Sequence, residues 1–232
     1  MTLAVVFTST FAGATGLGGG LMLLSVLPNF LPATAIIPVH AVTQWVSNAS
    51  RLSMGLRYLD KTLIRPLAIG AIAGALLGAA LYSKLPTDYL PLILGLWVLW
   101  LTWIPQPRLP IPQKFTFVFL GFYQSAISMA LGATGPLGTA LLMRHSKDRE
   151  YLVINTALYM TLSHTCRVAA FTLLGFSFID WWLELGILCS GAILGSWFGT
   201  KIRPYIRQDH ALKILKGILT LLALRLIASV VL

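Results

Sequence analysis

The hydrophobic positions of this chain gather in long apolar segments separated by short polar connections. We read eight segments, at residues 3–28, 32–56, 63–81, 89–104, 115–143, 151–174, 181–200 and 211–232. The first and the fifth are each interrupted by a cluster of glycines. A hydrocarbon core about 30 Å thick needs about 20 apolar residues per helix. The pattern therefore predicts a bundle of membrane helices, two of which are broken.

A proline-rich stretch divides the pattern almost in half. Residues 105–114 contain four prolines, and proline removes a helical N–H donor and clashes with the preceding turn, so no helix continues through them. We therefore divide the chain into a membrane repeat at residues 1–104, a linker at 105–114 and a second membrane repeat at 115–232.

The two halves also resemble each other in their residues. Gly-Ala-Thr-Gly occurs at 13–16 and again at 132–135, and the stretch 47–51, which ends in Arg51, matches 163–167, which ends in Arg167. A third match pairs Gly70, Gly74 and Gly78 with Gly191, Gly195 and Gly199. All three matches fall at offsets of 116 to 121 residues and in the same order, which indicates an internal duplication.

The basic residues predict how the two copies are oriented. Four full crossings per half would make the repeats parallel, but the basic loop at 57–65 would then correspond to 175–180, which has no base. If each broken segment is instead a re-entrant hairpin, each half has three crossings and nearly all loop bases share one side. The positive-inside rule makes that side cytoplasmic. These bases are Arg57, Lys61, Arg65, Arg108, Lys114, Arg144, Lys147, Arg149, Lys201, Arg203 and Arg207, with Lys84 as the main exception.

We therefore predict an all-α integral membrane protein made of two inverted repeats. Each repeat is a glycine-broken, re-entrant helix pair plus three transmembrane helices. Broken segments that cross the membrane fully remain the alternative.

Composition supports a membrane protein and excludes several functional classes. The chain is 57% hydrophobic and only 10% charged, whereas soluble domains carry about a quarter charged residues. The basic residues that give the chain its net charge of +10 lie between apolar segments, so we expect no nucleic-acid partner. Cys166 and Cys189 lie inside apolar segments, and we find no phosphate-binding loop, metal-ligand cluster or dinucleotide fingerprint. We expect no cofactor and no metal.

The N-terminus lacks basic residues before its apolar run, so we expect no cleaved signal peptide.

The glycine clusters predict a binding site at membrane depth. Backbone groups that a helix break releases cannot face lipid, so they must be buried in protein or line a cavity. A half-helix that restarts after the break presents free N–H donors and the positive end of its dipole. Close helix packing is the alternative role for glycines, and it suits better the two regularly spaced sets at 70–78 and 191–199.

The second segment of each half carries one polar stripe. In the first half it contains His40, Gln44, Ser47, Asn48 and Arg51, and in the second Thr156, Tyr159, Ser163, His164 and Arg167. All seven acidic residues lie in loops or at segment ends. Both stripe arginines therefore lack an obvious carboxylate, and an exogenous oxyanion would suit the guanidinium fork. The alternative is that they bond helix-end carbonyls or reach the membrane surface.

These considerations give a set of candidate site residues. His40 and His164 are candidates for proton coupling, because imidazole titrates near neutral pH, or else for hydrogen bonding alone. Candidates for substrate binding are Gly16, Gly18, Gly19, Gly20, Gln44, Asn48, Arg51, Thr134, Gly135, Gly138, Ser163, His164 and Arg167.

The glycine run at 13–20, the segment from Pro38 through Gln44 to Arg51, and the degenerate second copy resemble the TauE/SafE family of sulfite and organosulfonate exporters. The resemblance covers nearly the whole chain. It departs at the second break, where Pro136, Leu137 and Thr139 replace a run of glycines. The resemblance implies a multi-pass permease of the bacterial inner membrane for sulfur-containing anions or organic acids.

The expected function is a secondary transporter that exports small sulfur-containing oxyanions, such as sulfite or organosulfonates, by alternating access. Its partners are a small anionic substrate and the lipid bilayer, and a homodimer is one arrangement that the sequence allows. The alternatives are an anion-binding sensor or assembly factor without transport, a channel, and an intramembrane enzyme that would use Ser190 and His164.

Overall fold

The chain is entirely helical over the residues that the computed structural model describes, which are 1–84, 89–105, 111–134 and 137–231. These residues form ten α-helices joined by turns and short 3-10 helices, and they contain no strand. The first half holds α1 (Thr2–Thr15), α2 (Gly19–Val26), α3 (Ala33–Ser53), α4 (Ile64–Tyr82) and α5 (Leu90–Trp103). The second holds α6 (Thr116–Leu131), α7 (Leu137–Leu142), α8 (Arg149–Leu173), α9 (Trp182–Ile202) and α10 (Gln208–Val231). The predicted helices and both predicted breaks are confirmed.

Glycines in the left-handed conformation end both broken helices. α1 ends at Gly16 (φ +85°) and α6 at Gly132 (φ +77°), a conformation that costs other residues about 1–2 kcal/mol. The two caps lie 116 residues apart, as do Arg51 and Arg167. Gly13 lies inside α1. The four-letter match, which pairs Gly13 with Gly132, is therefore displaced by almost one helical turn from the structural equivalence.

Each broken helix packs closely against a helix of the other half. α1 lies along α9, and α6 lies along α4. Glycines allow this approach, because a Cβ at Gly74 would overlap the Phe122 carbonyl oxygen and one at Gly195 would overlap that of Val6. The packing role expected for the two regularly spaced glycine sets is confirmed.

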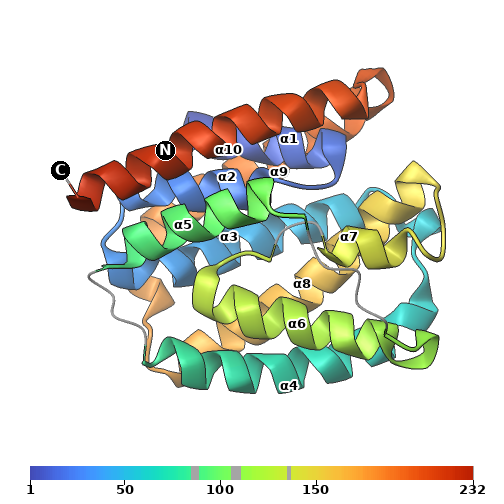
Figure 1. Ribbon diagram of the computed structural model, residues 1–232, viewed down its shortest axis with the longest axis horizontal. Coiled ribbons are helices and arrows are strands. Elements are labelled where there is room, and N and C mark those ends of the chain that lie inside the picture. Colours follow the sequence, from blue (N-terminus) through green and yellow to red (C-terminus); the bar gives the residue numbers. More distant parts are fainter. Residues whose placement is uncertain (85–88, 106–110, 135–136, 232) are drawn as a thin grey trace.

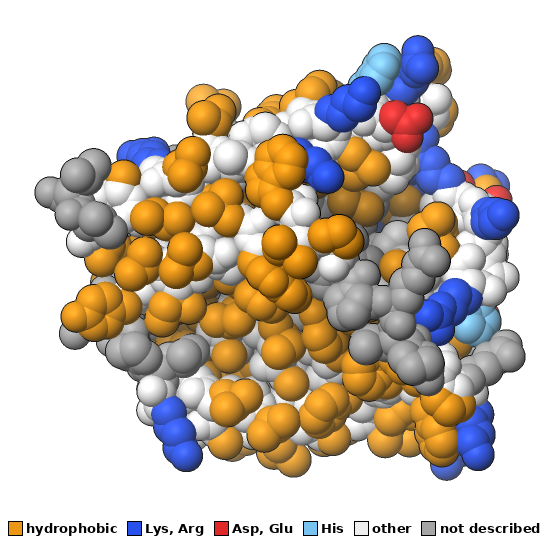
Figure 2. Space-filling view, viewed as in Figure 1, with side chains coloured by type: hydrophobic (Ala, Val, Ile, Leu, Met, Phe, Trp, Pro, Cys, Tyr) orange, Lys and Arg blue, Asp and Glu red, His pale blue; other side chains and the backbone are white. Residues whose placement is uncertain are grey.

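Chain direction groups the connections at two ends of the molecule (Figure 1). Both termini lie toward the left end of the view, together with the α2–α3 and α8–α9 connections and the C-terminal end of α4. The α3–α4, α7–α8 and α9–α10 connections lie at the right end. Figure 2 shows most of the visible Lys and Arg side chains at that right end, and hydrophobic side chains over the middle. This grouping agrees with the loops that the sequence assigns to the cytoplasm.

Burial follows the pattern of a membrane protein, with apolar residues outside and polar residues inside. Two stretches, Lys61–Tyr82 and Phe178–Tyr205, are long and apolar enough to cross a membrane. Their outward residues are strongly exposed, including Leu76 at 70% and Leu194 at 55%. By contrast, the polar stripes of α3 and α8 are buried inside the protein. This arrangement keeps their polar groups out of the hydrocarbon, where they would be costly.

Candidate functional site

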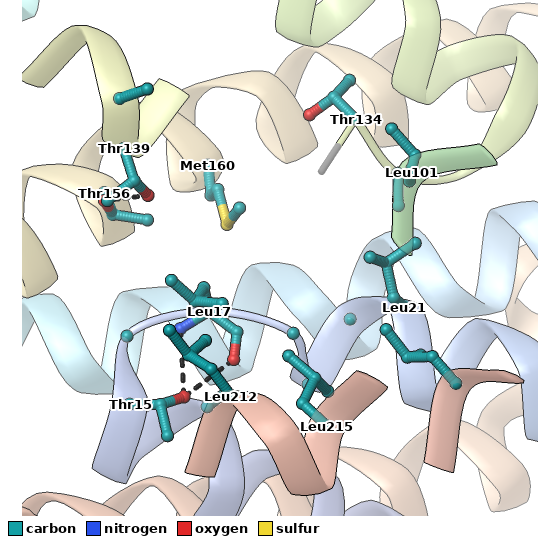
Figure 3. Close-up of a pocket in the computed structure, with 18 of the residues that line it drawn as sticks. Thr15, Leu17, Leu21, Leu101, Thr134, Thr139, Thr156, Met160, Leu212 and Leu215 are labelled. Carbon is teal, nitrogen blue, oxygen red and sulfur yellow. Dashed lines mark hydrogen bonds between the residues drawn. The ribbon is translucent and has the colours of Figure 1, made fainter. Parts of the chain in front are cut away.

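A cavity of about 750 Å³ lies where the two helix breaks face each other. Its walls come from both breaks and from α2, α3, α5, α6, α7, α8 and α10 (Figure 3). Nine of the residues proposed from sequence line it: Gly16, Gly18, Gly19, Gly20, His40, Gln44, Arg51, Thr134 and His164. Asn48, Gly138, Ser163 and Arg167 do not line it, and Gly135 is outside the described residues. The cavity therefore unites residues that lie more than a hundred positions apart.

The first break is shaped by hydrogen bonds and by missing side chains. The Thr15 hydroxyl donates to the Leu17 carbonyl oxygen at 2.8 Å and accepts from its N–H at 3.3 Å (Figure 3). Gly18, with φ +85°, then leads into α2. The first N–H groups of α2 have no acceptor within the helix. A Cβ at Gly20 would lie 3.2 Å from Gln44 Oε1, so glycine brings the start of α2 against the polar stripe of α3.

Two histidines from opposite halves meet across this part of the cavity. The rings of His40 and His164 lie 6.2 Å apart in an edge-to-face arrangement. His40 Nε2 lies 2.9 Å from the Gly20 carbonyl oxygen. Because a carbonyl only accepts, Nε2 donates, and Nδ1 of the neutral ring is an acceptor. This Nδ1 is buried and has no partner among the described residues.

His164 has the opposite polarity. Its Nδ1 accepts from the Arg167 guanidinium, because arginine has no acceptor. The neutral ring then carries its proton on Nε2, so this histidine can donate a hydrogen bond. The pair therefore offers one acceptor, on His40, and one donor, on His164.

The two stripe arginines bind the ends of the broken helices. Arg51 donates to the Ala12 carbonyl oxygen at 2.9 Å and to Asn48 Oδ1. Arg167 donates to the carbonyl oxygens of Ser128 at 2.5 Å and Gly132 at 3.0 Å. Bonding to helix-end carbonyls, which the sequence offers as an alternative to an oxyanion partner, is thus confirmed for both arginines. A cation is favourable at the negative end of a helix dipole.

The acceptors of these bonds are uncharged, so the positive charge of the Arg51 guanidinium beside the cavity is not neutralised by them. In the part of the chain that the structure describes, neither of these arginines pairs with a carboxylate. Arg51 is 2% exposed and lines the cavity, whereas Arg167 lies behind His164. Arg51 is therefore placed to meet a ligand directly, and Arg167 to orient His164.

Sequence reasoning missed a cluster of donors at the end of α1. The carbonyl oxygen of Gly13 accepts from Arg203 Nε at 2.8 Å, and that of Ala14 accepts from Arg149 at 2.8 Å. Arg203 is buried and forms an ion pair with Glu150 at 2.5 Å. From the sequence alone, both arginines indicate only which side of the membrane their loops face. Their partners are far away in the sequence, so no local pattern reveals the contacts.

Other cavity residues were also missed. Gln124 accepts from the Thr134 hydroxyl, and a glutamine inside an apolar segment was a usable signal. Leucines on α2, α5 and α10 form an apolar wall, which Figure 3 shows through Leu21, Leu101, Leu212 and Leu215. No signal marked these leucines, because a leucine that faces a cavity and one that faces lipid look alike in a sequence.

The residues suggested for an intramembrane enzyme do not share a site. The Ser190 hydroxyl donates to the Gly186 carbonyl oxygen at 2.7 Å, and Ser190 lines a separate apolar groove with Trp182 and Leu194. His164 lines the main cavity instead.

Comparison with models of protein families places the chain in a known family. The model of the family described as Sulfite exporter TauE/SafE matches residues 1–226, which is nearly the whole chain. Neither the curated proteins nor the solved structures contain a significant match. The resemblance seen in the sequence is confirmed.

Proposed function

The chain belongs to the TauE/SafE family of sulfite exporters, whose members are membrane transporters and not enzymes, and from this premise we propose that it is a secondary transporter of small sulfur-containing oxyanions such as sulfite or organosulfonates. One observation carries the proposal. A cavity between two helix breaks is lined by a buried arginine, Arg51, that has no carboxylate partner among the described residues.

The proposed site holds the oxyanion between the two halves. Arg51 supplies charge, and the first N–H groups of α2, from Gly18 to Gly20, supply neutral donors. The amide of Gln44 and His164 Nε2 complete the site on the α3 and α8 sides. Residues behind the cavity hold these groups in position: Asn48 bonds Arg51, and Arg167 bonds His164.

Ser163 and Gly138 support the same site from behind the cavity wall. Ser163 bonds Ser125 of α6 at 3.0 Å, which ties α8 to the second broken helix. Gly138 lies against Tyr159, where a Cβ would overlap the phenol. Gly135 is part of the proposal from its sequence alone.

We infer that the two halves are inverted repeats. Three observations support this. The α1–α2 pair begins and ends at the left of Figure 1, whereas the α6–α7 pair begins and ends at the right. Arg51 and Arg167 each bond a carbonyl 39 residues earlier in the chain. Each broken helix packs on the other half.

Inverted repeats lead to a transport mechanism of alternating access, in which one half rocks against the other around the site. The cavity reaches exposed Lys147, which lies in the loop that the sequence assigns to the cytoplasm. The described conformation is then the one that accepts an anion from inside the cell. A negative interior would favour export by about 2.3 kcal/mol per charge per 100 mV.

For proton coupling we propose His40 and His164. Their rings face each other at the polar part of the cavity. Replacing both by neutral hydrogen-bonding residues, in His40→Gln and His164→Asn, tests this role. Anion flux that responds to a pH gradient equally in the wild type and the double variant would contradict it.

The experiment that tests the proposed function is a thermal-unfolding screen of oxyanions on the purified protein. We expect sulfite or sulfonates to raise the unfolding temperature, with chloride at equal ionic strength as the control. If no oxyanion stabilises the protein more than chloride does, the proposed site is wrong.

A further inference from the structure

We propose that the cavity is built for an organic anion with an uncharged hydrocarbon body, and that it binds such anions more tightly than inorganic sulfite. The structural basis is the junction of a polar end, at His40, Gln44 and Arg51, with a wall of leucines, most of which are buried. This inference rests on the proposed function and refines the substrate of the same site.

The polar end has the chemistry of an acidic headgroup site. Arg51, Gln44 and His40 are at most 4% exposed, and all line the cavity. They lie on one face of α3, and His164 faces them from α8. The N–H groups of Arg51, Gln44 and His164 would satisfy one sulfonate or carboxylate group, whereas the Nε2–H of His40 is already bonded to the Gly20 carbonyl oxygen.

The apolar wall is separate from these residues. It consists of Leu21 from α2, Leu101 from α5, and Leu212, Leu215 and Leu219 from α10. In Figure 3, Leu212 and Leu215 lie on the lower side of the cavity, and Leu21 and Leu101 lie on its right side. Leu215 and Leu219 are only 5% and 3% exposed. The wall therefore lies inside the protein and does not belong to its lipid-facing surface.

The start of α2 joins the polar end to the apolar wall. A Cβ at Gly20 would approach Gln44 and His40, whereas a Cβ at Gly18 would overlap the Leu215 side chain. Two residues of one turn thus face the two different surfaces. An anion bound at the N-terminus of α2 has polar groups on one side and leucines within reach on the other.

Inorganic sulfite would use only part of this site. It carries no carbon, so the leucines would remain against water while it is bound. Ligand cavities of about 300–1,000 Å³ with mostly apolar walls typically enclose organic ligands, and this cavity has about 750 Å³. Each buried methylene contributes about 0.8 kcal/mol, which is about a fourfold gain in affinity.

The charges of the cavity also disfavour a cationic group on the ligand. Among the described residues that line it there is no Asp or Glu, while Lys147, Arg149 and Lys216 do line it. A ligand with an ammonium group on its tail would meet these cations without a carboxylate. We therefore expect alkanesulfonates to bind more tightly than aminoalkanesulfonates of equal length.

The test uses the full-length protein in lipid nanodiscs and measures dissociation constants for sulfite and for the alkanesulfonates from methane- to hexanesulfonate. We expect affinity to rise by about fourfold per methylene over the first few carbons. Sulfite should bind more weakly than hexanesulfonate. A flat series, or one in which sulfite binds tightest, would overturn the inference.

Two leucines of α10 provide a matched pair of variants. Leu219 is 3% exposed and lines the cavity, whereas Leu221 is 71% exposed and does not. Leu219→Ala should weaken hexanesulfonate binding several-fold and leave methanesulfonate binding unchanged, while Leu221→Ala should change neither. Equal effects of the two variants would count against the proposed wall.

Binding must also depend on Arg51, because hydrophobic anions partition into lipid. Hexanesulfonate binding that persists in Arg51→Met would show that the wall is not part of this site. A flat series that still requires Arg51 would overturn the hydrocarbon inference and leave the proposed function intact. If no anion binds at all, both are wrong.

Discussion

Replacing Arg51 with methionine should weaken anion binding strongly and leave the fold intact. Methionine is unbranched and reaches about as far as arginine Nε, so it fills the space of the aliphatic stem and leaves that of the guanidinium group open to the cavity. In the variant the Ala12 carbonyl oxygen keeps its bond from the Gly16 N–H at 2.8 Å. Asn48 Oδ1, however, loses its donor. An unsatisfied buried acceptor costs about 1–3 kcal/mol.

A second effect offsets this cost. The guanidinium is buried without a carboxylate among the described residues, and burying a charge is itself unfavourable. We therefore expect the free energy of unfolding to change by less than about 2 kcal/mol. The double variant Arg51→Met/Asn48→Leu removes the unpaired oxygen as well, and it should be at least as stable as the single variant.

The effect on binding should be much larger. Removing one partner of a buried charge pair costs about 2–5 kcal/mol of binding free energy. The dissociation constant then rises by a factor that lies between about 30 and a few thousand. An anion at 100 times its dissociation constant stabilises the wild type by about 2.7 kcal/mol. At that concentration the variant should gain less than about 1 kcal/mol.

Thermal unfolding with and without methanesulfonate measures both quantities on the same sample. Arg167→Met is the comparison, because Arg167 occupies the equivalent position and does not line the cavity. Its effect on binding should be smaller and should come through the orientation of His164. Full anion stabilisation in both the single and the double Arg51 variants would refute the assignment of Arg51 to the site.

Three further predictions concern the fold and its orientation. Gly19→Ala should destabilise the protein by about 1–3 kcal/mol, because its Cβ would overlap the carbonyl oxygen of Thr8. Gly217→Ala has open space around its Cβ, so it should stabilise the protein by about 0.5–1 kcal/mol in the same unfolding assay. Arg203→Met should lower stability by about 1.5–3 kcal/mol, because it breaks charged hydrogen bonds, and an unchanged melting curve would contradict this role. The third prediction uses single cysteines in a variant without native cysteines. A membrane-impermeant thiol reagent should label Lys147→Cys from the cytoplasm and Lys84→Cys from the opposite side. If both cysteines are labelled from the same side, three crossings per half are refuted.

The sequence predicted the helices well because their signals are local. The polar stripes of α3 and α8 repeat at helical spacing, and the structure buries both. Both breaks also follow from composition, since glycine tolerates the left-handed conformation seen at Gly16 and Gly132.

The exact pairing of the two breaks could not be predicted. The repeated Gly-Ala-Thr-Gly places Gly13 opposite Gly132, whereas helix capping makes Gly16 its equivalent. The letters match at one register and the backbone conformations at another. Only the φ angles distinguish the two.

The walls of the cavity were the least predictable part of the site. Leu219 and Leu221 are identical in sequence terms, yet one faces the cavity and the other is exposed. Which face of α10 turns inward depends on packing against α5 and α2. Arg149 and Arg203 similarly gained a structural role through contacts with α1, more than a hundred residues away.

The most direct test of the central claim is counterflow of a radiolabelled sulfonate in proteoliposomes. The account predicts that vesicles loaded with unlabelled sulfonate accumulate label when they contain the wild type and do not when they contain Arg51→Met. Equal counterflow in both would contradict the claim that Arg51 holds the anion. Binding without any counterflow in the wild type would show a receptor in place of a transporter.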